Sequence, residues 1–192
     1  MTGFLFDDDP AWSPPPDLVA FLAAGEAPVY VGFGSMPDAN PAATTRTILD
    51  AVRRTGKRVI LLTGWAGLGA DEVPEDIYIL KYAPHSWLFP KMAAVVHHGG
   101  SGTTASGLRA GVPTAVVPHQ GDQGFWGRTV KDLGVGAVPI PRKKLTADNL
   151  VAAITEATSN PAMKARAVAL SEKIAVEDGL AEAVKWVERF LV

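Results

Sequence analysis

Two adjacent histidines precede glycine and hydroxyl residues in the stretch His97–Thr104, HHGGSGTT. Glycine lets the backbone approach a ligand closely, and a helix amino terminus adds unpaired N–H donors and the positive end of its dipole. A second small-residue loop, GFGSM, carries Gly34 and Ser35. The hydroxyls of these two loops and one imidazole can donate further hydrogen bonds. Together these groups predict a cradle for a diphosphate.

A metal site is the first alternative reading of the histidines. His97 and His98 are neighbours in a predicted strand end, so their side chains point to opposite faces and do not favour a shared ion. His85 and His119 are further candidate ligands, but no carboxylate lies at a suggestive spacing. For His98, a second alternative remains open: a histidine in a turn that forms hydrogen bonds only to backbone.

Other nucleotide and hydrolase motifs do not match. Gly32-x-Gly34 meets Pro37 where the dinucleotide fingerprint needs its third glycine, and no Walker loop occurs. The hydrolase motif Gly-x-Ser-x-Gly fails after Ser35 and again after Ser101. The sequence therefore does not support serine hydrolase chemistry.

The elements that must position these loops follow from short apolar runs. Such runs are near-continuous rather than alternating, as in parallel strands covered on both faces. Strands are predicted at residues 29–33, 58–62, 77–80, 93–96, 114–117 and, weakly, 136–139. Helices are predicted between them, at residues 18–24, 41–55, 103–110 and 123–133. This alternation predicts a doubly wound α/β sheet with its ligand beyond the carboxyl ends of the strands.

The two ends of the chain differ in character. Residues 1–17 contain an acidic triplet and Pro14–Pro16, which predicts an extended, linker-like arm before a domain at 18–192. Three helices are predicted after Pro141, the first capped by Thr146. The last has an apolar stripe from Leu180 to Leu191. We expect that stripe to pack on the sheet, with docking on a neighbouring domain as the alternative.

Composition narrows the function classes. The chain has 192 residues, of which 20% are charged, and a formal net charge of −2, so it does not predict a nucleic-acid-binding surface. It has no cysteine, which excludes disulfides and thiolate metal sites. No apolar run reaches the length of a membrane span, and no signal peptide is evident, so we expect a cytoplasmic protein. The run Arg142–Lys144 leaves peripheral contact with anionic lipid open.

Several ordered motifs together resemble the signature box of family 1 glycosyltransferases with the GT-B fold. They are GFGSM, APHSWLFP, HHGGSGTTASGLRAGVPTAVVP and GDQGFWG, and they look most similar to the sterol 3-beta-glucosyltransferase branch and its bacterial relatives. The likeness extends over nearly the whole chain. It implies the carboxyl-terminal, Rossmann-like half of a GT-B fold, which holds a UDP-sugar, with UDP-glucose the expected donor.

The resemblance also implies roles for individual residues. On the diphosphate side these are Gly34, Ser35, His98, Gly100, Gly102, Thr103 and Thr104. On the base and ribose side they are Tyr82, which would stack on uracil, Ala83, His85, Trp87 and Ser106, the last replacing a ribose-binding glutamate of plant members. Asp122 and Gln123 match the pair that bonds to sugar hydroxyls, while Trp126 is balanced between packing and shaping the sugar pocket.

The family's catalytic base is a histidine in the amino-terminal, acceptor-binding domain, so no catalytic residue is assigned to this chain. We expect no cofactor and no metal. The acceptor domain is expected as a partner in cis or in trans, and the face it leaves exposed is a candidate for self-association. Two alternatives stay open: a nucleotide-binding subunit of a split glycosyltransferase, and a GT-B nucleotide-sugar epimerase.

Overall fold

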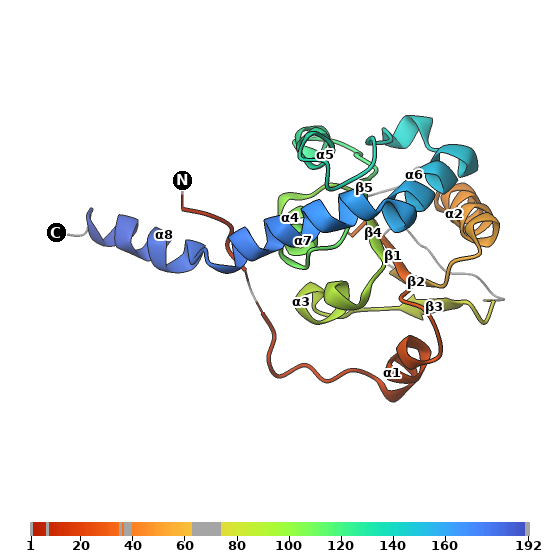
Figure 1. The fold of residues 1–192 in the computed structure, drawn as a ribbon, viewed down its shortest axis with the longest axis horizontal. Helices are drawn as coiled ribbons and strands as arrows, with labels where there is room; N and C mark the ends of the chain where they lie inside the picture. Colours follow the sequence, from red (N-terminus) through yellow and green to blue (C-terminus); the bar gives the residue numbers. More distant parts are fainter. Residues whose placement is uncertain (1, 7, 35, 37–39, 63–73, 191–192) are drawn as a thin grey trace.

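A five-stranded parallel sheet forms the centre of the molecule, as the sequence predicts (Figure 1). The computed structural model describes residues 2–6, 8–34, 36, 40–62 and 74–190. The strands lie in the order β3-β2-β1-β4-β5. Their bounds are β1 (Val29–Gly32), β2 (Val59–Leu62), β3 (Ile77–Leu80), β4 (Ala94–His97) and β5 (Thr114–Val116).

Helices cover both faces of this sheet and so bury its apolar residues. One face packs on α2 and α6 through a cluster that includes Ile48, Val96 and Ile154; the other packs on α1 and α3 through Leu18, Val95 and Leu88. The helices are α1 (Pro16–Ala23), α2 (Pro41–Thr55), α3 (His85–Leu88), α4 (Ser101–Arg109), α5 (Gln123–Asp132), α6 (Ala147–Ser159), α7 (Pro161–Ala175) and α8 (Gly179–Glu188), with 3-10 turns η1 (Phe89–Lys91) and η2 (Arg142–Lys144).

The strand order creates the crevice in which a ligand is expected. β1 pairs with β2 on one side and β4 on the other, so the chain order reverses between β1 and β4. Gly32 at the end of β1 lies opposite His97 at the end of β4. In open α/β sheets such a switch point opens a crevice beyond the carboxyl ends of the strands. The loops that follow Gly32 and His97 meet there.

Local signals set several helix ends. Asn40 accepts a hydrogen bond from the N–H of Ala43 at the start of α2, and Gly56 ends that helix in a left-handed conformation, which favours glycine. Thr146 forms a capping box with Asn149 at the start of α6, so the predicted cap is confirmed.

The weak strand predicted at residues 136–139 is wrong. Only an isolated bridge joins Gly136 to Thr114. The N–H groups of Ala137 and Ile140 bond to the carbonyls of Thr114 and Val116, so the segment holds one residue too many for a regular ladder. Pro139 also has no N–H to donate.

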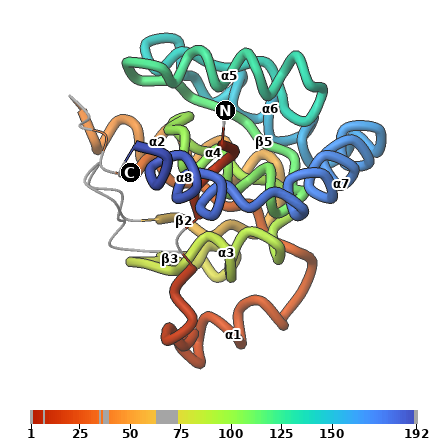
Figure 2. The backbone as a smooth tube through the Cα atoms, turned by 90° about the vertical axis from the view of Figure 1, so that its left-hand side faces the viewer, coloured from red at the N-terminus to blue at the C-terminus, as the bar shows by residue number. Residues whose placement is uncertain are grey.

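The packing predicted for the last helix is also wrong. α8 projects away from the body in Figure 1 rather than lying on the sheet, and in Figure 2, viewed from that end, it lies in front of the body. Leu180 is 61% exposed, and Val184, Val187 and Phe190 are exposed as well. The reason is that other helices already cover both faces of the sheet. Among the described residues, no helix is both long and apolar enough to cross a membrane.

The amino-terminal arm lies against the side of the molecule from which α8 projects. Phe4 packs with Phe6 on a cluster formed by α4, α5 and α7. Its ring centroid lies 5.8 Å from that of Trp126 in α5. Further along, the ring of Trp12 packs on that of Trp87 in α3, with ring centroids 5.0 Å apart.

Candidate functional site

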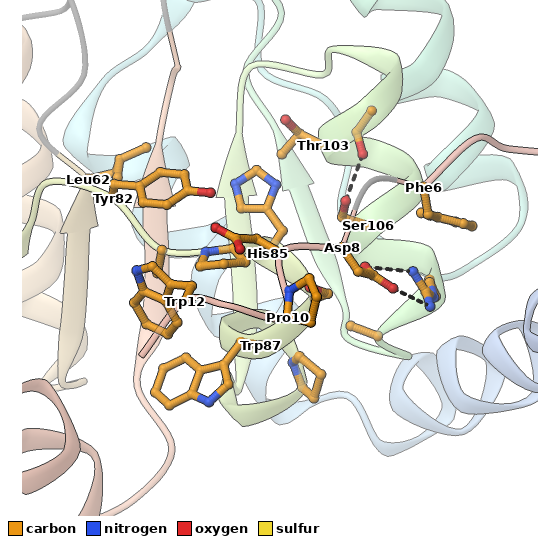
Figure 3. Close-up of a pocket in the computed structure, with 18 of the residues that line it drawn as sticks. Phe6, Asp8, Pro10, Trp12, Leu62, Tyr82, His85, Trp87, Thr103 and Ser106 are labelled. Carbon is orange, nitrogen blue, oxygen red and sulfur yellow. Dashed lines mark hydrogen bonds and ion pairs between the residues drawn. The ribbon is translucent and has the colours of Figure 1, made fainter. Parts of the chain in front are cut away.

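A pocket of about 900 Å³ lies between α3 and the start of α4 (Figure 3). One wall carries residues predicted for base binding, and the opposite wall is formed by α4, from Gly102 to Arg109. The arm forms the third wall, with Asp8 and Trp12 lining it. From the predicted set the pocket collects Tyr82, Ala83, His85, Trp87, Gly102, Thr103 and Ser106.

The start of α4 offers donors to this pocket. Its N-cap is Gly100, and no side chain caps the helix. The first N–H that bonds within the helix is that of Thr104, to the carbonyl of Gly100 at 2.9 Å. The N–H groups of the preceding turn, from Ser101 to Thr103, have no partner in the helical ladder. A helix end of this kind favours an anion.

The hydroxyls near this helix end are not equivalent. Thr104 is buried, and its hydroxyl and N–H both donate to the Gly100 carbonyl, so in this structure Thr104 stabilises the first helical turn. Ser106 donates its hydroxyl hydrogen to the Gly102 carbonyl at 2.9 Å and keeps its oxygen as an acceptor toward the pocket. Thr103 also lines the pocket.

His98 lies between the two glycine loops. A Cβ atom added to Gly34 would lie 3.3 Å from Cε1 of His98, and one added to Gly100 would lie 2.5 Å from its Nε2. The buried Nδ1 has no hydrogen-bond partner among the described residues. Burial lowers the pKa of His98, nearby His119 lowers it further, and Asp122 opposes the shift. The glycines thus give this imidazole room beside the crevice. Ser35, predicted for the same cradle, lies outside the described residues.

His97 has a different role from His98. It is fully buried, and its Nδ1 accepts a hydrogen bond from the N–H of Gly99 at 3.0 Å. Burial lowers its pKa to about 3, with smaller contributions from His98 and His85, so the ring is neutral. The two adjacent rings are nearly perpendicular, with centroids 6.2 Å apart. In the part of the chain that the structure describes, no three metal-ligating side chains come together.

The wall predicted for base binding carries two aromatic residues, of which only Tyr82 is largely exposed. Tyr82 is 58% exposed and lines the pocket beside the buried Ala83. Trp87 is already in contact with Trp12 and with the ammonium of Lys91, which lies 4.0 Å from its ring centroid. The ring of Tyr82 is therefore the more accessible stacking surface.

His85 completes that wall. It stacks on Phe89 with centroids 4.2 Å apart. Burial lowers its pKa to about 4, with a smaller contribution from His98. A neutral His85 can offer one donor and one acceptor to a base edge.

The predicted sugar residues separate at the start of α5. Asp122 is exposed and accepts a hydrogen bond from the indole N–H of Trp126 at 2.9 Å, so Trp126 orients the carboxylate. Gln123 is buried instead. Its amide oxygen accepts the N–H groups of His119 and Gln120 at 2.7 and 3.1 Å, which fixes the turn before α5.

Sequence reasoning missed the residues that the arm and the end of α4 bring to the pocket. Asp8 and Arg109 lie far apart in sequence but form a two-bond ion pair at its edge. One signal was present: Arg109 lies three residues after Ser106 and so shares its helix face. Nothing local to Asp8 indicates where the arm docks.

The chain as a whole is similar to known glycosyltransferases in sequence and fold. Residues 46–190 match the family model described as erythromycin biosynthesis protein CIII-like, C-terminal domain. The chain is 45% identical over 187 residues to a sterol 3-beta-glucosyltransferase of Arabidopsis thaliana, covering 96% of this chain and 29% of that protein. The chain thus spans under a third of that relative's length.

Solved glycosyltransferase structures are also similar to this chain. The glycotransferase of kitacinnamycin superposes with a TM-score of 0.73 at 26% identity, over 93% of this chain and 45% of that one. The glycosyltransferase VinC, solved in complex with DTDP, superposes with a TM-score of 0.69 at 26% identity, over 91% of this chain and 43% of that one. The chain therefore belongs to the erythromycin biosynthesis protein CIII-like C-terminal domain family of GT-B glycosyltransferases.

Proposed function

We propose that this domain binds the UDP-sugar donor of an inverting glycosyltransferase that transfers a hexose, with glucose expected, to a sterol or another lipophilic hydroxyl. One observation carries the proposal. A single pocket extends from the aromatic wall at Tyr82 to the uncapped start of α4, beside Thr103. It offers stacking at one end and anion-binding dipoles at the other. The DTDP complex of VinC and the sterol glucosyltransferase relatives support this reading.

The residues present suit the departure of a diphosphate. Negative charge grows on the leaving oxygen during transfer, and fixed N–H dipoles at the start of α4 stabilise it together with the His98 imidazole. Asp122 orients the sugar through its hydroxyls, which is a positioning effect. We place the base that deprotonates the acceptor in a separate acceptor-binding domain. This stabilisation uses protein groups, so we expect donor binding in the presence of a metal chelator.

Titration calorimetry with UDP and UDP-glucose tests the proposal. The wild-type domain should bind both, with and without EDTA. Replacing His98 by Ala should weaken UDP binding about tenfold to a hundredfold, because a hydrogen bond to a charged group contributes about 1.5–3 kcal/mol. Asp122→Asn should weaken UDP-glucose binding and leave UDP binding unchanged.

A matched control is Asp132→Asn at the other end of α5, where the carboxylate is exposed. It should change neither affinity. A folded wild-type domain that binds neither nucleotide would refute the proposal. Rapid sterol glucosylation by this chain alone would refute only the placement of the base elsewhere.

A further inference from the structure

The amino-terminal arm brings a fixed carboxylate to the pocket. The two carboxylate oxygens of Asp8 accept hydrogen bonds from the two terminal nitrogens of Arg109, at 3.1 and 3.0 Å (Figure 3). The same guanidinium lies 4.4 Å from the ring centroid of Phe6. Asp8 and Arg109 both line the pocket. The arm, the ring and the ion pair therefore hold one carboxylate group in a defined place.

Stability alone does not explain this pair well. The side chains of Arg109 and Asp8 are 38% and 48% exposed, and ion pairs with that exposure contribute little to folding. The pair is also neutral overall, so it places acceptor oxygens near a diphosphate site without adding net negative charge. Each oxygen of Asp8 uses one lone pair on Arg109 and keeps another for a ligand.

Asp8 lies on the pocket wall beside Ser106, the residue that the sequence predicts for ribose binding. The aromatic end of the pocket carries Tyr82, and the anion-binding end carries Thr103 at the start of α4. Ser106 lines the same pocket one turn after Thr103 on α4, and Asp8 lies beside it in Figure 3. In a nucleoside diphosphate the ribose joins base and diphosphate, so the ribose should reach the stretch of wall formed by Ser106 and Asp8.

The local chemistry suits a ribose diol. The hydroxyl of Ser106 gives its hydrogen to the Gly102 carbonyl and is left as an acceptor. Asp8 adds charged acceptors beside it. A carboxylate that accepts a ribose hydroxyl is how dinucleotide-binding α/β domains fix this sugar.

We propose that Asp8, held by Arg109, accepts hydrogen bonds from the ribose hydroxyls of the bound nucleotide. The arm is then part of the donor site and makes it selective for ribonucleotides. This inference rests on the proposed function, because it assumes that the pocket takes a nucleoside diphosphate.

The test compares UDP with 2′,3′-dideoxyUDP by calorimetry. Wild-type protein should bind UDP about tenfold more tightly than the dideoxy nucleotide. Asp8→Ala should lose about tenfold in UDP affinity and change dideoxyUDP affinity by less than about twofold, so that the discrimination disappears. Arg109→Gln frees the Asp8 carboxylate without removing it. This variant should therefore lose less UDP affinity than Asp8→Ala does.

Two controls separate ligand contact from arm docking. Asp9→Ala removes a carboxylate that lines the same pocket but bonds to the N–H of Ala11, and it should leave both affinities unchanged. Phe6→Leu loosens the docking of the arm but keeps Asp8, so it should lower the ratio of UDP affinity to dideoxyUDP affinity by less than Asp8→Ala does. Thermal unfolding of each variant confirms that it is folded.

The outcomes are distinguishable. If Asp8→Ala weakens both nucleotides equally, or neither, the inference is overturned while the proposed function stands. If folded wild-type protein binds no UDP, the inference and the proposed function are both overturned.

Discussion

At the scale of single residues, two neighbouring histidines show how burial separates roles that the sequence leaves equivalent. His97 is fully buried and accepts the N–H of Gly99, whereas His98 reaches the crevice with an unpartnered Nδ1 among the described residues. His97 thus positions the loop in which His98 lies. It can do so only while its ring is neutral, because a protonated ring has no lone pair to accept with.

This role predicts a pH dependence of stability. The pKa of His97 is about 3 in the fold and about 6.5 in an unfolded chain, so below pH 6.5 the unfolded state takes up a proton that the folded state does not. The free energy of unfolding should therefore fall as the pH drops from 6.5 toward 3, by about 2 kcal/mol between pH 7 and pH 5.

His97→Asn tests this prediction by urea unfolding at the two pH values. Asparagine keeps an acceptor for the N–H of Gly99 but does not titrate. The wild-type protein should lose about 2 kcal/mol more than the variant between pH 7 and pH 5. The contribution of His85, whose pKa burial lowers to about 4, occurs in both proteins and cancels. Equal losses in both would contradict the prediction.

The site residues show what sequence could and could not predict. The sequence predicts a diphosphate cradle from a local signal, because glycines and hydroxyls follow a strand. It could not distinguish Thr103 from Thr104, or Asp122 from Gln123. Within each pair the two side chains point in different directions, and the sequence does not show which of them faces the interior. Thr104 and Gln123 are buried and bond to backbone, while Thr103 is half-buried and Asp122 is exposed.

At the scale of elements, two glycines where β4 leads into α4 have different surroundings. Gly99 has φ +90°, and a Cβ there would lie 2.6 Å from Cγ1 of Val116. Gly102 is helical, and a Cβ there would have no atom within 4 Å. Gly99 permits the turn, and Gly102 faces open space in the pocket.

Two alanine variants separate these effects. Gly99→Ala should lower the free energy of unfolding by about 3 kcal/mol, from backbone strain and overpacking. Gly102→Ala should keep or slightly raise stability, because alanine favours a helix, but should weaken UDP binding by filling the pocket. Gly56→Ala, with φ +61° in open space, measures the cost of strain alone. Urea unfolding and calorimetry give both readouts; a Gly102→Ala protein with wild-type UDP affinity would contradict the assignment.

The elements were largely predictable from the sequence. The two wrong predictions, a strand at residues 136–139 and the packing of α8, both depend on contacts with distant parts of the chain. Strand runs and the helix at residues 41–55 follow from local periodicity and caps, so sequence suffices. The strand prediction at residues 136–139 is wrong because strand pairing also depends on register with β5, and Pro139 breaks that pairing. The packing predicted for α8 is wrong because an apolar stripe shows that a helix is amphipathic but does not show which surface of the protein is still uncovered.

At the scale of the whole molecule, the amino-terminal arm connects elements that the sheet does not. It contacts the start of α8 at Gly179, α5 at Trp126, α4 at Arg109 and α3 at Trp87. These contacts join the region around Asp122 to the pocket at Tyr82. The arm is therefore placed to hold both ends of the proposed donor site in one arrangement.

Gly179 is the position at which this docking can be tested with one methyl group. A Cβ at Gly179 would overlap the backbone carbonyl of Phe4, which a side-chain adjustment cannot relieve. Gly179→Ala should displace the arm while leaving the sheet core intact, because alanine itself is favourable at the start of a helix. We expect chymotrypsin to cleave at Phe4 and Phe6 much faster than in wild-type protein, with global stability reduced by about 1–2 kcal/mol.

Gly124→Ala is the matched control, since its Cβ would meet only the flexible end of Arg128 at 3.6 Å. Cleavage of the arm should stay at the wild-type rate in that variant. Because displacement of the arm also removes Asp8 from the pocket, Gly179→Ala should reduce UDP affinity more than dideoxyUDP affinity. If the arm of Gly179→Ala resists the protease as well as that of the wild-type protein, the arm does not depend on its contact with α8.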